Sequence, residues 1–252
     1  MSQSALWAVV PVKSFACAKQ RLAPLLDRHE RTALARAMFE DVLNALMQCR
    51  GVAGIMVVTQ DADATAMARR AGATTLSDPL EAGLLPALRH AAHHLAAARR
   101  AGMLVVPADL PLITTADIEM ITREHRRSSG VTLVGACSDG GTNALACSPP
   151  DAIPFFFGAD SFRRHCEAAL ALGLSPRVLA PPRFGHDIDR PDDLLAFLAR
   201  PSATGTYAFL TDSGIAERLC EPRTPEPTQA PAHSLALSAG AWAPHQSEGW
   251  NP

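Results

Sequence analysis

The sequence predicts an α/β fold, in which a mostly parallel sheet carries helices on both faces. Short apolar runs rich in β-branched residues alternate along the chain with segments of helical periodicity. The apolar runs are nearly continuous, as expected for strands that are buried on both faces of a sheet. Hydrophobic residues fill 48% of the 252 positions and the mean hydropathy is +0.05, so the chain can bury a sizeable core.

The individual strands and helices follow from these patterns. Apolar runs predict strands at 6–12, 55–59, 74–76 and 103–109, a strand pair at 131–137 and 143–148 around a Gly-Gly turn, and an extended segment at 177–182. Helical patterns occur at 29–49, 62–71, 84–101 and 160–173. Two more helices are expected after Thr114, where capping residues and early acids occur, and at Pro191, because proline suits a first helical turn.

Composition also indicates how the chain is divided into domains. We expect one domain over residues 1–200, a short packed extension over 201–220 and a disordered tail over 221–252. The tail is rich in proline and alanine and has no periodic apolar face, so it cannot bury enough surface to offset its ordering entropy. Trp242 and Trp250 within it leave a docking peptide open as an alternative.

The same composition excludes several functional classes. The net charge of −2 provides no basic surface for nucleic acid, and no apolar run reaches the roughly 18 residues that a membrane span needs. The N-terminus lacks the basic region and the cleavage site of a signal peptide. Six scattered cysteines without a C-x-x-C pair are typical of free thiols in a reducing compartment. The sequence therefore predicts a cytoplasmic protein that binds neither nucleic acid nor membrane.

A group of cations follows the first predicted strand. Lys13, Lys19 and Arg21 lie within nine residues, just past the strand's carboxyl end, where ligands bind in sheets of this kind. Lysine and arginine form charge-assisted hydrogen bonds to phosphate. The loop is not a P-loop, because no G-x-x-x-x-G-K-[ST] occurs in the chain. The spacing alone leaves two interpretations: the three cations bind a polyphosphate, or they face solvent, which is more common for such groups.

Three aspartates suggest a site for a divalent cation. Asp109 ends an apolar run, where a carboxylate is costly unless it is solvated, caps a turn or binds a cation. In an extended segment, Asp187 and Asp189 point to the same side and Ile188 to the other. Oxygen-only ligands suit magnesium, with manganese as the alternative ion. The competing interpretations are a turn cap at Asp109 and an N-cap at Asp189, ahead of the Pro191 helix.

Two other groups of polar residues are candidate binding sites. His90, His93 and His94 have helical spacing and offer a zinc alternative, but no acid or cysteine accompanies them, which favours solvated histidines. Thr142 and Ser161 stand in glycine-containing segments, where backbone can approach an anion closely and hydroxyls can donate to it. The alternative for these segments is a hairpin turn and a helix cap.

Taken together, the motifs resemble the guanylyltransferases of coenzyme F-420 biosynthesis. The patterns V-P-V-K, A-K-x-R-L, P-A-D-L-P, G-T-N-A, F-G-x-x-S-F and D-I-D-x-P-x-D-L follow one another in order over about residues 6–199. The resemblance implies a GT-A-like, Rossmann-type three-layer nucleotidyltransferase fold. It also implies the condensation of GTP with a phosphorylated three-carbon acid, which gives a GDP-linked acid and pyrophosphate. Of 3-phospho-D-glycerate, 2-phospho-L-lactate and phosphoenolpyruvate, we expect the first.

The resemblance also assigns roles to residues of this chain. Asp109, Asp187 and Asp189 match the acids that hold magnesium and form the catalytic centre. Thr142, Gly158 and Ser161 match the positions that bind the phosphorylated acid. Lys13, Lys19 and Arg21 match the cationic loop that meets the GTP phosphates. The expected partners are GTP and the small acid, and a homodimer is left open.

One departure from the family pattern keeps other functions open. Leu85 stands where the family usually has asparagine, on the presumed nucleotide side. A molybdenum-cofactor or sugar-phosphate nucleotidyltransferase is the nearest alternative, although such enzymes usually carry a glycine-rich loop after the first strand and residues 13–18 contain no glycine. An alternative of another class is a nucleotide-binding protein without turnover, which Leu85 and the long tail leave open.

Overall fold

The structure is a computed structural model that describes residues 5–77, 83–128, 130–136 and 140–220. The tail predicted over 221–252 lies outside the described residues, as do Cys137 and Asp139. The strands and helices below are therefore those of the described part of the chain.

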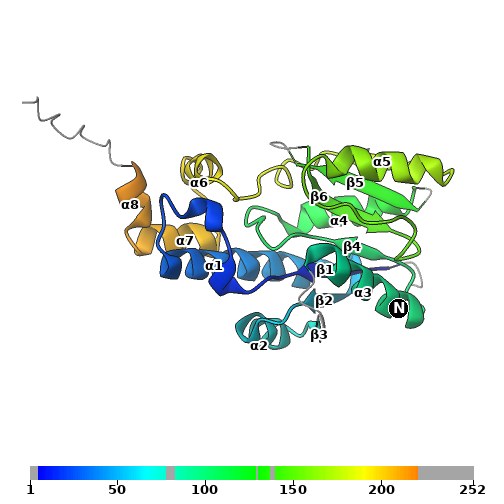
Figure 1. The fold of residues 1–252 in the computed structure, drawn as a ribbon, viewed down its shortest axis with the longest axis horizontal. Coiled ribbons are helices and arrows are strands. Elements are labelled where there is room, and N and C mark those ends of the chain that lie inside the picture. The colour runs from blue at the N-terminus through cyan, green and yellow to red at the C-terminus, as the bar shows by residue number, and fades with distance from the viewer. Residues whose placement is uncertain (1–4, 78–82, 129, 137–139, 221–252) are drawn as a thin grey trace, which may run out of the picture. The chain divides into compact units, whose positions relative to one another are not determined.

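Seven strands form one sheet, and the prediction of a mostly parallel sheet is confirmed (Figure 1). Strand β6 is antiparallel to its neighbours β4 and β5, as expected for a strand pair around the Gly-Gly turn, and every other pairing is parallel. In spatial order the strands are β3 (Thr74–Leu76), β2 (Val52–Val58), β1 (Leu6–Pro11), β4 (Met103–Val105), β6 (Thr142–Cys147), β5 (Val131–Gly135) and β7 (Arg177–Leu179).

Strand β4 is shorter than the apolar run 103–109 predicts. It ends at Val105, although the backbone N–H of Val106 still donates to the carbonyl of Val9 at 3.0 Å. The next residue, Pro107, has no N–H to continue the ladder. The chain therefore leaves the sheet just before Asp109.

The helices begin where capping residues precede apolar faces. Asp27 with Glu30, and Thr114 with Asp117, form reciprocal capping boxes that satisfy free N–H groups of the first turn. The helices are α1 (Arg28–Met47), α2 (Ala62–Arg70), α3 (Leu84–Ala97), α4 (Thr115–His125), α5 (Ser161–Ala171), α6 (Pro191–Leu198), α7 (Gly205–Asp212) and α8 (Ile215–Cys220), with 3-10 turns η1 (Phe15–Cys17) and η2 (Gln20–Leu22). None of the described helices is long and apolar enough to cross a membrane.

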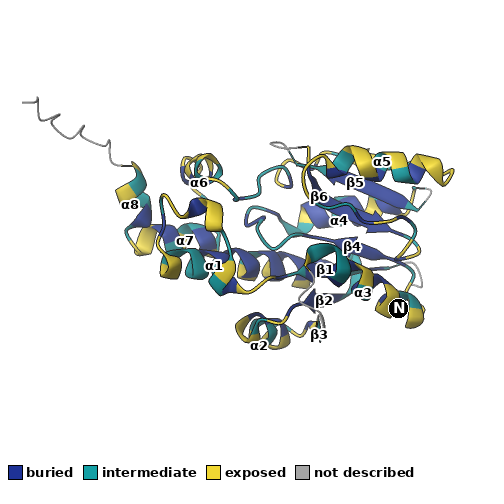
Figure 2. Cartoon of the chain, in the orientation of Figure 1, coloured by how far each residue is buried: buried dark blue, intermediate teal, exposed yellow. Residues whose placement is uncertain are grey.

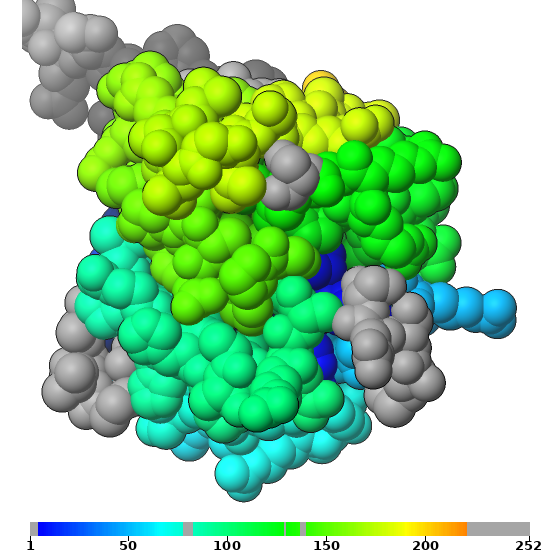
Figure 3. Space-filling view, turned by 90° about the vertical axis from the view of Figure 1, so that its right-hand side faces the viewer, coloured from blue at the N-terminus to red at the C-terminus, as the bar shows by residue number. Residues whose placement is uncertain are grey.

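Helices cover both faces of the sheet and make two hydrophobic cores, which Figure 2 shows as buried strands between partly exposed helices. One core joins α1, α2 and α4 to strand residues such as Ala8, Val57 and Ala146. The other joins α3 and α5 to alternate strand residues such as Val9, Met56 and Leu145. Figure 3 shows the side of the molecule on which α3 and α5, with their loops, form much of the visible surface.

The C-terminal helices of the described chain pack on α1. Leu210 of α7 and Ile215 of α8 are buried with Leu34 and Met38 of α1. Asp41 of α1 accepts hydrogen bonds at 2.8 Å from the first two N–H groups after Thr204, at the start of α7. Carboxylates stabilise helix N-termini, so this contact holds α7 against α1 (Figure 1).

Because of the buried His125, we expect the folded protein to lose stability in acid. Its buried ring contacts the hydroxyls of Thr132 at 3.0 Å and Ser148 at 2.9 Å, and burial lowers its pKa to about 4. A histidine in the unfolded chain titrates near 6.5, so between these values only the unfolded state binds the proton and stability falls with falling pH. We expect this residue to cost about 2 kcal/mol between pH 7 and pH 5.

Urea denaturation at the two pH values measures this loss. The variant His125→Gln should lose less stability than the wild type over the same interval, because glutamine does not titrate. Equal losses in the two proteins would show that His125 is not the titrating group.

Candidate active site

A cavity of about 1100 Å³ opens where β1, β2 and β4 end at their carboxyl termini. This is the position at which ligands bind in open α/β sheets. Its described lining includes the predicted cations Lys13, Lys19 and Arg21 and two of the three predicted acids, Asp109 and Asp189. The described lining does not include Asp187, Thr142, Gly158 or Ser161.

The loop after β1 is held in place by Asp61, a residue outside the site that the sequence predicts. One carboxylate oxygen accepts from the backbone N–H of Phe15 at 2.9 Å, and the other accepts from Asp63 and Ala64 at 3.0 Å. The Asp61 side chain thus caps α2 and also fixes the loop that carries Lys13, Lys19 and Arg21. Burial acts to raise the pKa of Asp61, but the hydrogen bonds from Ala64 and Phe15 outweigh it and the pKa is lowered.

Lys19 joins two of the predicted acids directly. Its Nζ lies 2.6 Å from Oδ2 of Asp109 and 3.2 Å from Oδ1 of Asp189. Only 8% of the Lys19 side chain is exposed. Burial acts to lower the pKa of Lys19, but the charges of Asp109 and Asp189 outweigh it and the pKa is raised. Lys19 is therefore a charged lysine between two carboxylates.

The backbone at Lys19 is left-handed, with φ 53° and ψ 40°. A side chain in this conformation costs on the order of 1 kcal/mol, which the two ion pairs offset. Arg21 adds a further contact, since its Nη1 lies 2.7 Å from Oδ2 of Asp189. Burial acts to raise the pKa of Asp189, but Lys19 and Arg21 outweigh it and the pKa is lowered.

The D-I-D segment is fastened to the loop after β4. The backbone N–H of Ile188 donates to the carbonyl of Asp109 at 3.1 Å, and the Ile188 side chain is buried between α1 and α6 residues. Asp189 does not cap α6, as one interpretation of the sequence had it. Arg190 is the N-cap residue, and Asp193 accepts its N–H at 2.7 Å. The Asp189 carboxylate is thereby left to the cations of the cavity.

Asp187 is held by Asn143, a residue of the G-T-N-A motif to which the sequence assigns no role. The register of β5 and β6 shifts between Val134 and Gly135, so Asn143 is the extra residue of a β-bulge. Its Nδ2 donates to Oδ1 of Asp187 at 3.1 Å and to the Phe184 carbonyl at 2.7 Å. A buried amide in an apolar strand is the signal that would have revealed it.

The electrostatics of Asp187 differ from those of Asp189. Burial raises the pKa of Asp187, and the nearby charge of Asp109 raises it further. Among the ion pairs of the described residues, none involves Asp187, whereas Asp109 and Asp189 share Lys19. The acid of P-A-D-L-P and those of D-I-D are therefore neighbours. Asp187 is the one of the three that has no compensating cation among the described residues.

This donor set fits a hard divalent cation. The groups are oxygen-only, and two carboxylates already converge on one positive charge, the Lys19 ammonium. In the described ranges no three His, Cys, Asp or Glu side chains are grouped as a ready-made metal site. A metal bound by Asp109 and Asp189 would thus replace Lys19 between them.

The predicted acid-binding residues form a second group beside α5. Ser161, at the start of α5, and Thr142 are buried, and their hydroxyl oxygens lie 3.0 Å apart. Gly158 is exposed with φ 127°, and the space where a Cβ would lie is open, so the backbone conformation rather than crowding favours glycine there. The described cavity lining reaches Phe157, next to this group.

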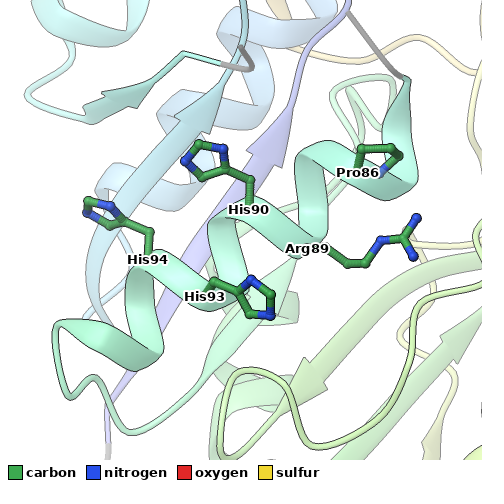
Figure 4. A pocket seen from close by; sticks show the side chains of 5 residues that line it. All are labelled: Pro86, Arg89, His90, His93 and His94. Atoms are coloured by element: carbon green, nitrogen blue, oxygen red, sulfur yellow. The ribbon is translucent and has the colours of Figure 1, made fainter. Parts of the chain in front are cut away.

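The remaining predictions concern α3. His93 and His94 are exposed and His90 is half-buried, and Figure 4 shows the imidazoles of His90 and His94 on one flank of the helix. They belong to no metal-binding group of three within the described residues. Leu85 packs against the core under α3, and its neighbours Gly83 and Leu84 line the cavity instead.

Two solved structures have a fold similar to that of this chain. A protein from Desulfovibrio desulfuricans G20 assigned to the nucleotide-diphospho-sugar transferases matches 87% of this chain and 99% of its own, with a TM-score of 0.70 and 17% identity. CMP:2-keto-3-deoxy-manno-octonic acid synthetase, solved with CTP, matches 83% of this chain and 99% of its own, with a TM-score of 0.55 and 12% identity. At these identities the likeness shows the fold, which is the expected nucleotidyltransferase type.

Relatives of higher identity define the family. The phosphoenolpyruvate guanylyltransferase of Roseiflexus sp. (strain RS-1) is 41% identical over 197 residues, which are 78% of this chain and 86% of the relative. The 3-phospho-D-glycerate guanylyltransferase of Phenylobacterium zucineum (strain HLK1) is 34% identical over 216 residues, 81% of this chain and 95% of the relative. The family model "Guanylyl transferase CofC like" matches residues 6–225. The chain therefore belongs to the CofC-like guanylyl transferase family.

Proposed function

We propose that the protein transfers the GMP part of GTP to a phosphorylated three-carbon acid and releases pyrophosphate, as a step of coenzyme F-420 biosynthesis. The observation that carries the proposal is the cavity in which Lys19 meets Asp109 and Asp189, because it gathers the charged groups that a triphosphate and its cation require. Membership of the family supports the choice of GTP and of the acid.

The reaction needs little acid–base catalysis. The second pKa of a phosphomonoester is near 6, so the acid's phosphate is mostly a dianion at neutral pH. One of its oxygens attacks the α-phosphorus of GTP and forms the new P–O bond. The bond from the α-phosphorus to the oxygen that bridges to the β-phosphate breaks, and pyrophosphate leaves with that electron pair. The protein must therefore align two anions and neutralise their charge.

The residues of the cavity suit this task. Lys13, Lys19 and Arg21 would bind the β- and γ-phosphates and stabilise the departing pyrophosphate. Asp61 would keep their loop in place through its bonds to the backbone. Thr142, Gly158 and Ser161 would hold the phosphorylated acid, with hydroxyl and backbone groups as donors.

Magnesium, or manganese in its place, would be held by Asp109, Asp187 and Asp189. When bound, the ion supplies charge neutralisation at the phosphate oxygens and orients them. Asn143 would fix the carboxylate of Asp187 for this purpose, and Arg21 would keep Asp189 in place while Lys19 turns to the phosphates.

We also place the protein in the cytoplasm, because the scattered cysteines of the sequence, which include no C-x-x-C pair, are typical of free thiols in a reducing compartment.

An assay of pyrophosphate release tests the function and identifies the acid. Purified protein is given GTP and magnesium with phosphoenolpyruvate, 3-phospho-D-glycerate or 2-phospho-L-lactate in turn. We expect release with GTP and one of the acids, with 3-phospho-D-glycerate as the prediction from the sequence. Reactions with ATP, CTP or UTP, and reactions without acid, serve as controls. Absence of release with all three acids would reject the proposal, and tight GTP binding under those conditions would favour the non-catalytic alternative.

A further inference from the structure

His165 is a buried histidine that none of the roles above uses. It lies on α5 four residues after Ser161, so the two side chains share one face of the helix. Its side chain is fully buried, with the rings of Phe156 and Phe157 centred 5.7 and 5.1 Å away. The imidazole thus stands directly behind the two hydroxyls that we assign to the phosphorylated acid.

The hydrogen bonds of the ring fix its protonation. The backbone N–H of Phe156 donates to Nε2 at 2.9 Å, so Nε2 must present a lone pair. Burial lowers the pKa of His165 to about 4, which keeps the ring neutral at physiological pH. A neutral ring with a lone pair on Nε2 carries its hydrogen on Nδ1. That nitrogen lies 3.0 Å from Oγ1 of Thr142 and donates to it.

A count of hydrogens shows what this tautomer does. Nδ1 of His165 and the hydroxyls of Thr142 and Ser161 carry three hydrogens, but only two contacts join them, His165 to Thr142 and Thr142 to Ser161. One hydroxyl hydrogen is therefore left to donate outside the trio. If the hydrogen were on Nε2 instead, Thr142 would donate to Nδ1, both hydroxyl hydrogens would be used, and the pair would offer only lone pairs.

An anionic oxygen needs a hydrogen-bond donor. The tautomer of His165 therefore decides whether the hydroxyls of Thr142 and Ser161 can bind such an oxygen. We propose that His165 is a positioning residue for the phosphorylated acid: by donating from Nδ1 to Thr142, it directs one hydroxyl hydrogen of the Thr142–Ser161 pair toward an anionic oxygen of the substrate. This inference rests on the proposed function and adds to it a residue that never touches the substrate.

Two substitutions of His165 distinguish the roles of the two ring nitrogens. In His165→Asn the amide nitrogen lies near the position of Nδ1 and keeps the donor to Thr142. In His165→Gln the amide oxygen reaches toward Phe156 and keeps that acceptor, but the donor to Thr142 is lost. We expect His165→Gln to raise the KM for the acid by about 10- to 100-fold, the loss typical of one hydrogen bond to a charged group. The KM for GTP should stay within about threefold of wild type, and His165→Asn should restore most of the KM for the acid.

The variant His125→Gln is the matched control, because it changes the other buried histidine of the described residues, which lies at the C-terminal end of α4 and contacts the hydroxyls of Thr132 and Ser148. It should lower stability without changing the KM for the acid. If His165→Gln leaves the KM for the acid unchanged in an active protein, or raises both KM values equally, the positioning role is wrong. An inactive wild type would instead reject the proposed function, and the inference with it.

Nitrogen NMR of the wild-type imidazole gives a test without any variant. We expect a neutral ring for His165 with the hydrogen on Nδ1 at pH 7. An Nε2–H tautomer or a charged ring would overturn the inference even if every variant failed to fold.

Discussion

The variant Asp189→Asn is expected to lower kcat by at least about 100-fold and to leave the free energy of unfolding nearly unchanged. The Asp189 carboxylate faces the cavity, where it contacts Lys19 and Arg21, and 39% of the side chain is exposed. Asparagine keeps an oxygen for these cations, Asp109 still neutralises the buried Lys19, and the exposed ion pair with Arg21 contributes little to stability. It removes the negative charge that a divalent cation needs, so the loss should fall on turnover.

Asp192→Asn is the matched control for that prediction. Asp192 is exposed in the first turn of α6, three residues away, and loses the same charge. Steady-state kinetics and urea denaturation of both variants give the comparison. Full activity of Asp189→Asn, or an equal loss in Asp192→Asn, would remove Asp189 from the catalytic centre.

Lys19→Gln is expected to lower kcat/KM for GTP by about 100-fold and to make the protein more responsive to metal. In the wild type the Lys19 ammonium lies between Asp109 and Asp189, so a divalent ion must displace it. Without that charge the two carboxylates repel one another, and an added cation relieves the repulsion. Mn²⁺ without GTP should therefore raise the Tm of Lys19→Gln more than that of the wild type, and EDTA should abolish the difference.

Lys13→Gln separates this effect from a general loss of positive charge. Lys13 lines the same cavity, is exposed, and makes no ion pair among the described residues. Its variant should respond to Mn²⁺ as the wild type does. If Mn²⁺ raises the Tm of the wild type and of Lys19→Gln equally, Lys19 does not compete with the metal. A metal position between Asp109 and Asp189 would then be wrong.

Much of the fold follows from local sequence. The capping box of Thr114 and Asp117 starts a helix where the sequence predicts one, because it satisfies N–H groups within four residues. The apolar run over 55–58 forms the buried part of strand β2 because it is apolar on both faces. Strand ends were less predictable: Pro107 limits β4 although the apolar run continues past it.

Local sequence also singled out the residues of the site one motif at a time. A charged group after an apolar strand is visible without any structure, and so are the cations near Lys19 and the acid at Asp109. Their partners are not visible, because Asp109 and Asp189 lie 90 and 170 residues from the lysine that joins them. Asn143 and His165 went without a role for the same reason, since each acts through a residue of a distant segment.

The sequence alone thus determined the class of fold, the kind of residue at each strand end, and the family. Only the tertiary structure decided that Lys19 rather than solvent faces the two carboxylates, that a β-bulge turns Asn143 to Asp187, and which nitrogen of His165 holds the hydrogen. Periodicity and capping arise from neighbours within a few residues. Charge pairing, burial and tautomer depend on which strands lie side by side, and strand order is a property of the whole chain.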